Sequence, residues 1–362
     1  MTSILRFGDI HPAIDGKPTP QLWSAELASA ASITPKSISW LWPQWLAKGK
    51  LTVLAGAGGS GKTTLAIGLI SCLTRGGHWP DGSRCNECGN ALIWSSEDDH
   101  ADTLVPRLIA AGADLTRVHF INGRISAVGE RDTFDPATNF DLLREAAARI
   151  GGVSLLLLDP MVSLVRGDMN KANDVRRSLQ VVVDFAEVHS CSVLGISHFS
   201  KGSGASSPAD RVIGSQAFSA LARTVLVAAK AADSDTRVLA RAKSNISDDQ
   251  GGVRYAIETC IVASNIETTR VVWGELVEGS AGDILAEVEC SDGDAGSDDD
   301  PSGALRRILR DGPITGKEVK KLMAENGYTT KQTRSARERL GVITSREGFG
   351  SEMTTYWSVS ET

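Results

Sequence analysis

"LTVLAGAGGSGKTTLAIGLI", residues Leu51–Ile70, decides the fold. Its first five residues are apolar and long enough for one buried strand. The next eight, Gly56–Thr63, fit the pattern G-x-x-x-x-G-K-[S/T] at every fixed position. In such a loop the backbone N–H groups turn inward and form a nest for phosphate oxygens, and glycine allows that curvature without a Cβ clash. A helical pattern follows, so we predict a phosphate-binding loop formed by Gly56, Ala57, Gly58, Gly59, Ser60, Gly61, Lys62, Thr63 and Thr64.

The side chains at the end of this loop predict the ligands, ATP and Mg²⁺. Lys62 is expected to reach the β- and γ-phosphates, and Thr63 to place its hydroxyl on Mg²⁺. Thr64 opens the helix, whose N-terminal dipole stabilises anions further.

Length and composition limit the class of protein. A chain of 362 residues predicts two or three domains, and 41% hydrophobic residues support a real core. Because the net charge is -6, any nucleic-acid surface must be local. The six scattered cysteines indicate a reducing, cytoplasmic location. No apolar stretch nears the ~20 residues that span a bilayer, so we expect no membrane association.

Apolar runs alternate with helical patterns after the loop, which predicts an α/β fold with a mainly parallel sheet covered on both faces. Three more apolar runs, 224–229, 237–242 and 253–259, follow each other closely, as antiparallel edge strands would. The expected earlier strands are 91–96, 117–121, 153–159 and 191–197, and the expected helices are 100–111, 140–150, 175–189 and 216–222.

Three tryptophans stand in "ISWLWPQWLAKGK", residues 38–50, just before the loop strand. Their indole rings can pack over an adenine or close the edge of the domain. We expect the packing role, because buried aromatic rings usually serve cores.

Two strand ends carry carboxylates. Asp159 ends the run "LLLLD", where it can hold Mg²⁺. The next residue is Pro160 and not an acid, so the carboxylate that activates the attacking water must come from another strand end. Glu97, at the end of "ALIWSS", is therefore the candidate that orients and polarises the attacking water. Asp98 and Asp99 are expected to cap the next helix. The alternative is that all three acids form a solvated turn.

His198 ends the strand "CSVLGIS" and can hydrogen-bond the γ-phosphate; the alternative is a histidine satisfied within the fold. The segment "SKGSGASSPADRVIGSQ", residues 200–216, is small and polar, and it predicts a mobile loop able to bind a polymer. Its cations are Lys201 and Arg211.

The chain resembles the RecA-like ATPases of the hexameric replicative helicase group, above all the plasmid RepA-type helicases and related phage ATPases. The matching pieces lie between about 40 and 259 and are "GAGGSGKTT", "ALIWSSEDD" with "RLIAAGAD", "LLLLDPMVSL", "GISHFSKG" and "RVIGSQAFSALAR". The resemblance implies a RecA-like fold, a catalytic base at Glu97, a Mg²⁺-organising Asp159 and a γ-phosphate sensor at His198. It also implies a homo-oligomeric ring, a hexamer, with ATP at the interfaces.

In such rings a neighbouring subunit inserts a cation that makes hydrolysis depend on assembly. Arg241 and Lys243 in "LARAKSN" are candidates for this role, and Arg211 and Arg223 are rivals. The sequence does not decide among the four.

The composition changes near the C-terminus. Between Asp283 and Asp300 there are eight acidic residues and no basic one, which predicts a solvated linker. From Arg306 to Arg346, eleven Lys/Arg stand against four Asp/Glu. The predicted domains are an N-terminal arm (1–36), the ATPase domain (37–282), the acidic linker (283–302) and a C-terminal domain (303–362).

The C-terminal domain reads as three helices and a hairpin. Thr315 is the expected cap of the second helix, and the third would expose Lys331, Arg334, Arg337 and Arg339. This pattern resembles the winged helices at the ends of phage replication and primase-associated proteins. Such a domain would place its third helix in a major groove and touch the backbone with its wing. The alternative is a protein-interaction winged helix with a solvated basic face.

Together these features predict an ATP-hydrolysing motor that acts on DNA in phage or plasmid replication, with single-stranded DNA through the ring and duplex on the winged helix. Two other functions stay open: an ATP-switched DNA-binding regulator or loader that unwinds nothing, and a recombination ATPase of the RecA/RadA type.

Overall fold

A computed structural model describes residues 26–200, 207–212, 217–231, 235–290, 301–310, 312–347 and 354–359. The chain divides into two units, Met1–Ile38 and Ser39–Thr362. The described part of the first unit holds one short 3₁₀ turn, Ala30–Ser32, which Ser29 caps. Most of the predicted arm, residues 1–25, lies outside the described residues.

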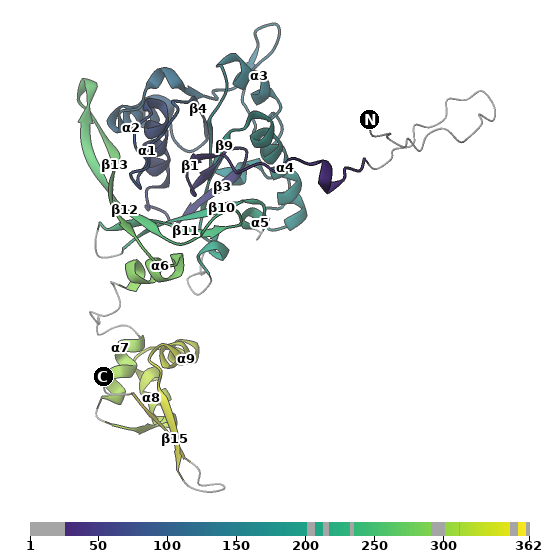
Figure 1. Cartoon of the computed structure of the whole chain (residues 1–362). Coiled ribbons are helices and arrows are strands. Elements are labelled where there is room, and N and C mark those ends of the chain that lie inside the picture. The colour runs from purple at the N-terminus through teal and green to yellow at the C-terminus, as the bar shows by residue number, and fades with distance from the viewer. Residues whose placement is uncertain are drawn as a thin grey trace, which may run out of the picture. The chain divides into compact units, whose positions relative to one another are not determined.

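Within the described residues, nine strands form one sheet in the order β13-β12-β11-β10-β3-β9-β8-β4-β5 (Figure 1). The six strands from β10 to β5 run parallel, and β11, β12 and β13 are antiparallel. This is the RecA-like α/β class that the sequence predicted. The parallel strands are β3 (Leu51–Gly56), β4 (Ala91–Ser95), β5 (Val118–Phe120), β8 (Leu155–Asp159), β9 (Ser192–His198) and β10 (Thr224–Lys230).

The antiparallel side differs from the prediction in two ways. The run 224–229 was expected to be an antiparallel edge strand, but β10 pairs in parallel with the loop strand β3. The strand at this edge of the sheet, β13 (Ile266–Val277), was not predicted. It forms a long hairpin with β12 (Gly252–Val262). β11 (Arg237–Ser244) joins that hairpin to β10.

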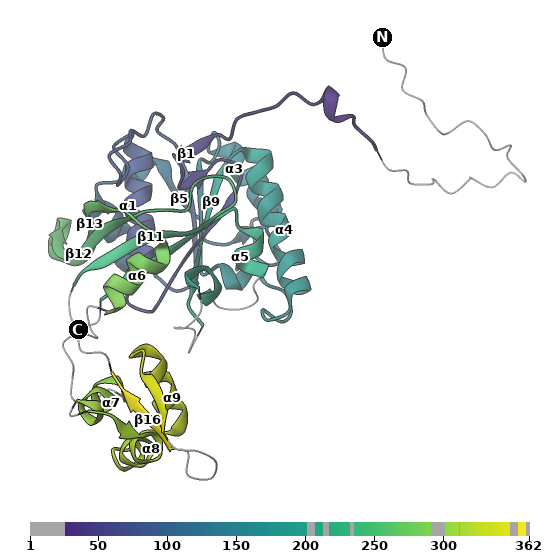
Figure 2. The same cartoon turned by 60° about the horizontal axis from the view of Figure 1, so that its bottom comes forward.

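Helices cover both faces of the sheet (Figure 2). Neighbouring residues of β3 point to opposite faces, so Val53 packs in one apolar cluster and Leu54 in the other. One face is covered by α1 (Lys62–Arg75) and α2 (Val105–Ala111), the other by α3 (Leu142–Arg149), α4 (Ala172–His189), α5 (Ala217–Leu221) and α6 (Ala281–Cys290).

Helix α6 corrects the predicted linker. Its residues Ile284, Leu285 and Val288 are buried in the core beside β10 and β11. The many acidic residues of this segment made it resemble a linker. Its apolar residues nevertheless recur at i, i+1 and i+4, the spacing that places them on the helix face toward the sheet. Residues 283–290 therefore belong to the ATPase domain, and the remaining stretch 291–300 lies outside the described residues.

The tryptophans form a core. Trp42 stacks on Trp45 with ring centroids 4.4 Å apart, and on Trp79 at 5.7 Å. All three are buried. The two short strands β1 (Trp40–Trp42) and β2 (Leu46–Ala47) pair around them. The predicted packing role is confirmed for Trp42 and Trp45, whereas Trp40 is half-buried.

The C-terminal domain has three helices and a small antiparallel sheet in the order β14-β16-β15. Thr315 caps α8 as predicted, because its hydroxyl accepts a hydrogen bond from the Glu318 N–H at 3.2 Å. Within this domain lie α7 (Pro301–Leu309), β14 (Ile314–Thr315), α8 (Gly316–Glu325), α9 (Thr330–Arg339), β15 (Ile343–Glu347) and β16 (Thr354–Ser358). The order of these elements, with one strand between the first two helices and a hairpin after the third, is that of a winged helix.

Two further strands, β6 (Arg124–Ile125) and β7 (Arg131–Asp132), form a small exposed hairpin after β5. They take no part in the site described below.

Candidate active site

The phosphate-binding loop connects β3 to α1, as predicted. Gly56 must be glycine, because a Cβ there would lie 2.3 Å from the carbonyl oxygen of Ala228 on β10. Gly59 and Gly61 have φ of +76° and +85°, in the left-handed region that glycine adopts without strain. The backbone of the loop is thus bent into the concave form that binds phosphate oxygens.

Lys62 is the first residue of α1, and its side chain folds back over the loop. Its Nζ donates hydrogen bonds to the carbonyl oxygens of Gly56, at 3.1 Å, and Ala57, at 3.0 Å. Burial lowers the pKa of Lys62, while Asp159 and Glu97 act in the opposite direction. The ammonium therefore stands over the loop where the negative charge of a triphosphate belongs.

Thr63 and Asp159 meet at the predicted metal position. The Thr63 hydroxyl donates to Asp159 Oδ2 at 2.8 Å. Asp159, at the end of β8, is 2% exposed, and this burial raises its pKa to about 6 although the Thr63 hydroxyl acts to lower it. A hydroxyl and a buried carboxylate are oxygen donors of the kind Mg²⁺ takes beside phosphates, so both residues fit the ion.

Glu97 follows β4, the strand that pairs with β8. Its side chain is exposed and lines the same cavity of about 230 Å³ as Lys62, Thr63 and Asp159. The structure thus brings both predicted carboxylates to the phosphate loop, at the carboxyl ends of neighbouring strands.

The two aspartates after Glu97 have different roles, which corrects the prediction that both cap a helix. Asp99 does cap the next turn, because its carboxylate accepts from the N–H groups of Ala101 and Asp102. Asp98 instead forms an ion pair with Arg107, with 2.9 Å between Nη1 and Oδ2. Both partners line the phosphate cavity.

Sequence reasoning missed Arg107 because it lies within the next helix, α2, and not at the strand end itself. The signal was present: Arg107 stands nine residues after Asp98, across a π-helical turn (His100–Leu104) and the start of α2. The pair fixes an arginine beside the site from within the same chain.

Sequence reasoning also missed Tyr255, on β12. Its hydroxyl is buried and donates to the carbonyl oxygen of Ser60 in the phosphate loop at 2.6 Å. Ile257, two residues further on, packs closely against Gly61. A Cβ added to Gly61 would lie 3.0 Å from Ile257 Cδ1. The antiparallel hairpin, whose second strand was unpredicted, thus holds the phosphate loop in place.

His198 ends β9, which lies between β3, the strand that leads into the phosphate-binding loop, and β8, which ends at Asp159. Its Nδ1 lies 3.5 Å from Lys62 Nζ, and the side chain lines the cavity. Burial and the nearby Lys62 lower the pKa of the imidazole, and Glu97 acts to raise it. The ring is therefore placed at the phosphate end of the site.

The predicted inserting cations Arg241 and Lys243 do not join this site. Arg241 is 8% exposed; its Nη1 donates to Gln44 Oε1 at 2.8 Å, and its guanidinium lies 4.9 Å from the centre of the Trp45 ring. Lys243 is half-buried and donates to the carbonyl oxygen of Ser219 at 2.7 Å. Both side chains are hydrogen-bonded within their own subunit, and their insertion into a neighbour's site stays a prediction.

The two rival cations differ in exposure. Arg211 was predicted to stand on a mobile loop, but it is 9% exposed and lies over the Phe199 ring. Arg223, just before β10, is exposed. Lys201, the other predicted loop cation, lies outside the described residues, as do 202–206 and 213–216.

The RecA-like sheet and this site define a P-loop ATPase, which binds ATP and typically uses Mg²⁺. The sequence profile of the AAA domain family (AAA_25) matches residues 17–204, more than half of the chain, and the chain belongs to this family. The comparison with solved structures finds, among others, the crystal structure of the RadB recombinase, with 18% identity, a TM-score of 0.42, and coverage of 59% of this chain and 89% of that one.

Among curated protein sequences, none matches the chain. In the part of the chain that the structure describes, no helix is both long and apolar enough to cross a membrane.

Proposed function

We propose that this ATPase is a ring-forming motor, a hexamer of the RepA helicase type, that acts on DNA in phage or plasmid replication. The observation that carries the proposal is the presence, in one chain, of a phosphate site with both carboxylates and a basic winged-helix fold. A basic helical domain of this kind commonly binds DNA, so its presence in the same chain as an ATP site supports action on DNA.

In the proposed reaction, the loop amides and Lys62 hold the triphosphate, and Thr63 and Asp159 hold Mg²⁺, which would neutralise charge on the phosphates. Glu97 orients the attacking water and polarises its O–H bond. Its exposure in a single subunit is consistent with a site that a neighbour closes. His198 hydrogen-bonds the γ-phosphate and responds when that group leaves.

Support for a ring comes from the charges around the site. Among the described residues that line the cavity, the cations are Lys62 and Arg107, and Arg107 is paired with Asp98. Charge on the transferring phosphoryl group is commonly stabilised by an arginine from another subunit. Arg223 is the best candidate of the four, because it is exposed and the other three are buried or hydrogen-bonded in their own chain.

A complementation experiment tests this assignment. Arg223→Ala and Lys62→Ala subunits should each be inactive alone, and a mixture should regain ATP turnover, because some interfaces then contain one intact Lys62 and one intact Arg223. A mixture that stays inactive while the wild type mixes normally removes Arg223 from the role. An equivalent mixture with Arg211→Ala serves as the comparison.

Three measurements test the function itself. The full chain with ATP and Mg²⁺ should separate the strands of forked DNA, have the mass of a closed oligomer, and form rings in electron micrographs. ATP-dependent DNA binding without strand separation would instead identify a regulator or loader. Filaments on DNA in place of rings would identify a recombination ATPase.

A further inference from the structure

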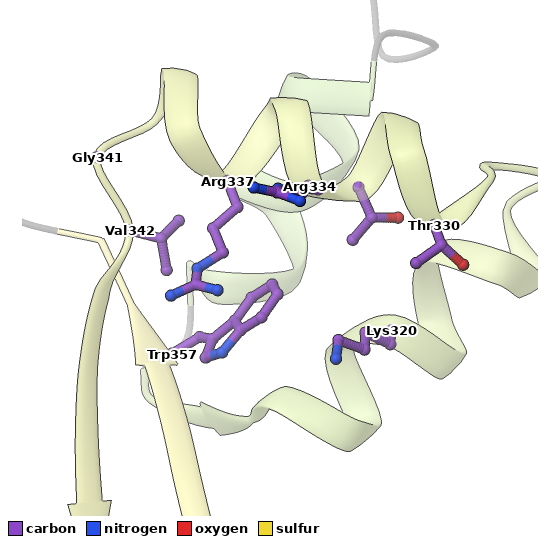
Figure 3. A pocket seen from close by; sticks show the side chains of 8 residues that line it. Lys320, Thr330, Arg334, Arg337, Gly341, Val342 and Trp357 are labelled. Atoms are coloured by element: carbon purple, nitrogen blue, oxygen red, sulfur yellow. The ribbon is translucent and has the colours of Figure 1, made fainter.

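The winged helix contains a pocket of about 500 Å³ between α8, α9 and β16 (Figure 3). Its volume is within the range of small-molecule sites. Lys320 contributes from α8, Thr330, Arg334 and Arg337 from α9, and Trp357 from β16. We call these five residues and the space between them the winged-domain pocket.

A tryptophan and an arginine form one wall of this pocket. The Arg337 guanidinium lies 4.6 Å from the centre of the Trp357 ring, within the range of a cation–π contact. Trp357 is 5% exposed, and a Cβ on Gly316 would lie 2.7 Å from its Nε1. The indole is therefore held firmly, and it holds the guanidinium in turn. Arg337 is half-buried, which corrects the prediction that it is an exposed cation of the third helix.

The charge of the pocket has one sign. Its lining includes three cations, and no carboxylate is among the described lining residues. In the described part of the domain neither Lys320 nor Arg337 forms an ion pair, whereas the adjacent Lys321 pairs with Glu325 at 3.8 Å. Lys320 and Arg337 therefore leave positive charge in a concave site, and such charge attracts an anion such as a phosphate.

The shape of the pocket determines which phosphate fits best. A duplex groove is read by a convex helix face, and backbone phosphates of a duplex need no cavity. An unpaired nucleotide protrudes, and its base stacks on aromatic rings and on arginine planes. We infer that the winged-domain pocket binds an unpaired nucleotide of DNA, with its phosphate on Lys320 and its base against Arg337. This inference rests on the proposed action on DNA and extends it to the junction between single and double strands.

The experiment compares two DNA molecules that differ only in a single-stranded overhang. Fluorescence anisotropy of the full chain, without ATP and at one fixed salt concentration, gives the affinity for the blunt duplex and for the duplex with the overhang. The pocket variants are Lys320→Ala, which changes an exposed side chain and is expected to fold, and Arg337→Gln. The matched control is Lys321→Ala, which removes the same charge from the next residue, outside the pocket.

Each pocket variant should weaken binding to the overhang DNA about tenfold, as expected for loss of one stacking or phosphate contact. Blunt-duplex binding should change less than about twofold, and Lys321→Ala should change neither by more. Unchanged overhang binding in both pocket variants, as for a pocket that serves a protein partner, overturns the inference. An equal loss on both DNA molecules also overturns it, since the pocket would then contact duplex phosphates.

The wild-type protein separates this inference from the function on which it rests. If the wild type binds neither DNA, the proposed action on DNA fails. If it binds both and the pocket variants behave like Lys321→Ala, only the inference about the pocket fails.

Discussion

At the scale of single residues, the site gathers charges that are unfavourable without a ligand. Lys62 is buried with its ammonium on two carbonyl oxygens, and Asp159 is buried with one hydroxyl as its partner. Each of these groups has a pKa displaced by burial toward the neutral form. A triphosphate and a divalent cation would satisfy both groups. The site is therefore organised for a ligand, and burying these groups lowers the stability of the protein without one.

The first prediction concerns Lys62. Lys62→Ala should remove ATP binding or turnover, because the substituted loop has no cation for the β- and γ-phosphates. Nucleotide binding by fluorescence and phosphate release measure the two effects. Retained turnover would mean that the loop is not the site of hydrolysis.

Glu97 is predicted to act on the water and not on the nucleotide. Glu97→Gln keeps the size of the side chain and one acceptor oxygen but removes the charge, so ATP should still bind while turnover falls by orders of magnitude. Asp98→Asn is the informative control, because it changes the adjacent carboxylate that pairs with Arg107. Normal turnover in Glu97→Gln would assign the base to another group.

Asp159 predicts a pH dependence of stability. Its pKa in the folded protein, about 6, is above the ordinary value of 3.8, so its favourable contribution is complete below about pH 4 and is lost as the pH rises through 6. The measurement is made without Mg²⁺ and nucleotide. The Tm of Asp159→Asn minus the Tm of the wild type should therefore increase between pH 4 and pH 6 and stay constant at higher pH. A gap that is the same at pH 4 and pH 7 would contradict this.

At the scale of elements, the sequence predicted the parallel strands and the residues at their carboxyl ends. Glu97, Asp159 and His198 were identifiable because each directly follows an apolar run, and such strand ends meet at one edge of a parallel sheet. The direction of β10 was not identifiable, because a close succession of apolar runs is compatible with both orientations. The surroundings of Arg241 were not identifiable either, because periodicity does not show that its side chain lies over Trp45.

Helix α6 yields a prediction about domain boundaries. It buries Ala281, Ile284, Leu285 and Val288, and full burial of such a side chain contributes roughly 1.5–3 kcal/mol for the larger ones. A chain that ends at residue 290 should keep basal ATP turnover, and a chain that ends at 280 should be destabilised by a large share of a typical domain's total stability.

Thermal unfolding and ATPase assays of the two truncated chains check this boundary. Equal Tm values would place α6 outside the folded ATPase domain, and the linker would then begin near 283 as the sequence first indicated.

At the scale of the whole molecule, one chain joins an ATPase with a basic winged helix, and the proposal is that ATP turnover serves movement on DNA. Sequence reasoning predicted both parts because each has its own pattern: a glycine-rich loop between strand and helix, and three short helices with a hairpin. It predicted neither the Arg337–Trp357 contact nor the fixation of the loop by Tyr255, since both depend on side chains far apart in the sequence.

The rate of ATP hydrolysis by the full chain, with and without single-stranded DNA, tests the central claim most directly. A motor on DNA should hydrolyse ATP several-fold faster when single-stranded DNA is added, and Glu97→Gln should abolish both rates. A wild-type rate that is high and independent of DNA at every concentration would contradict the account.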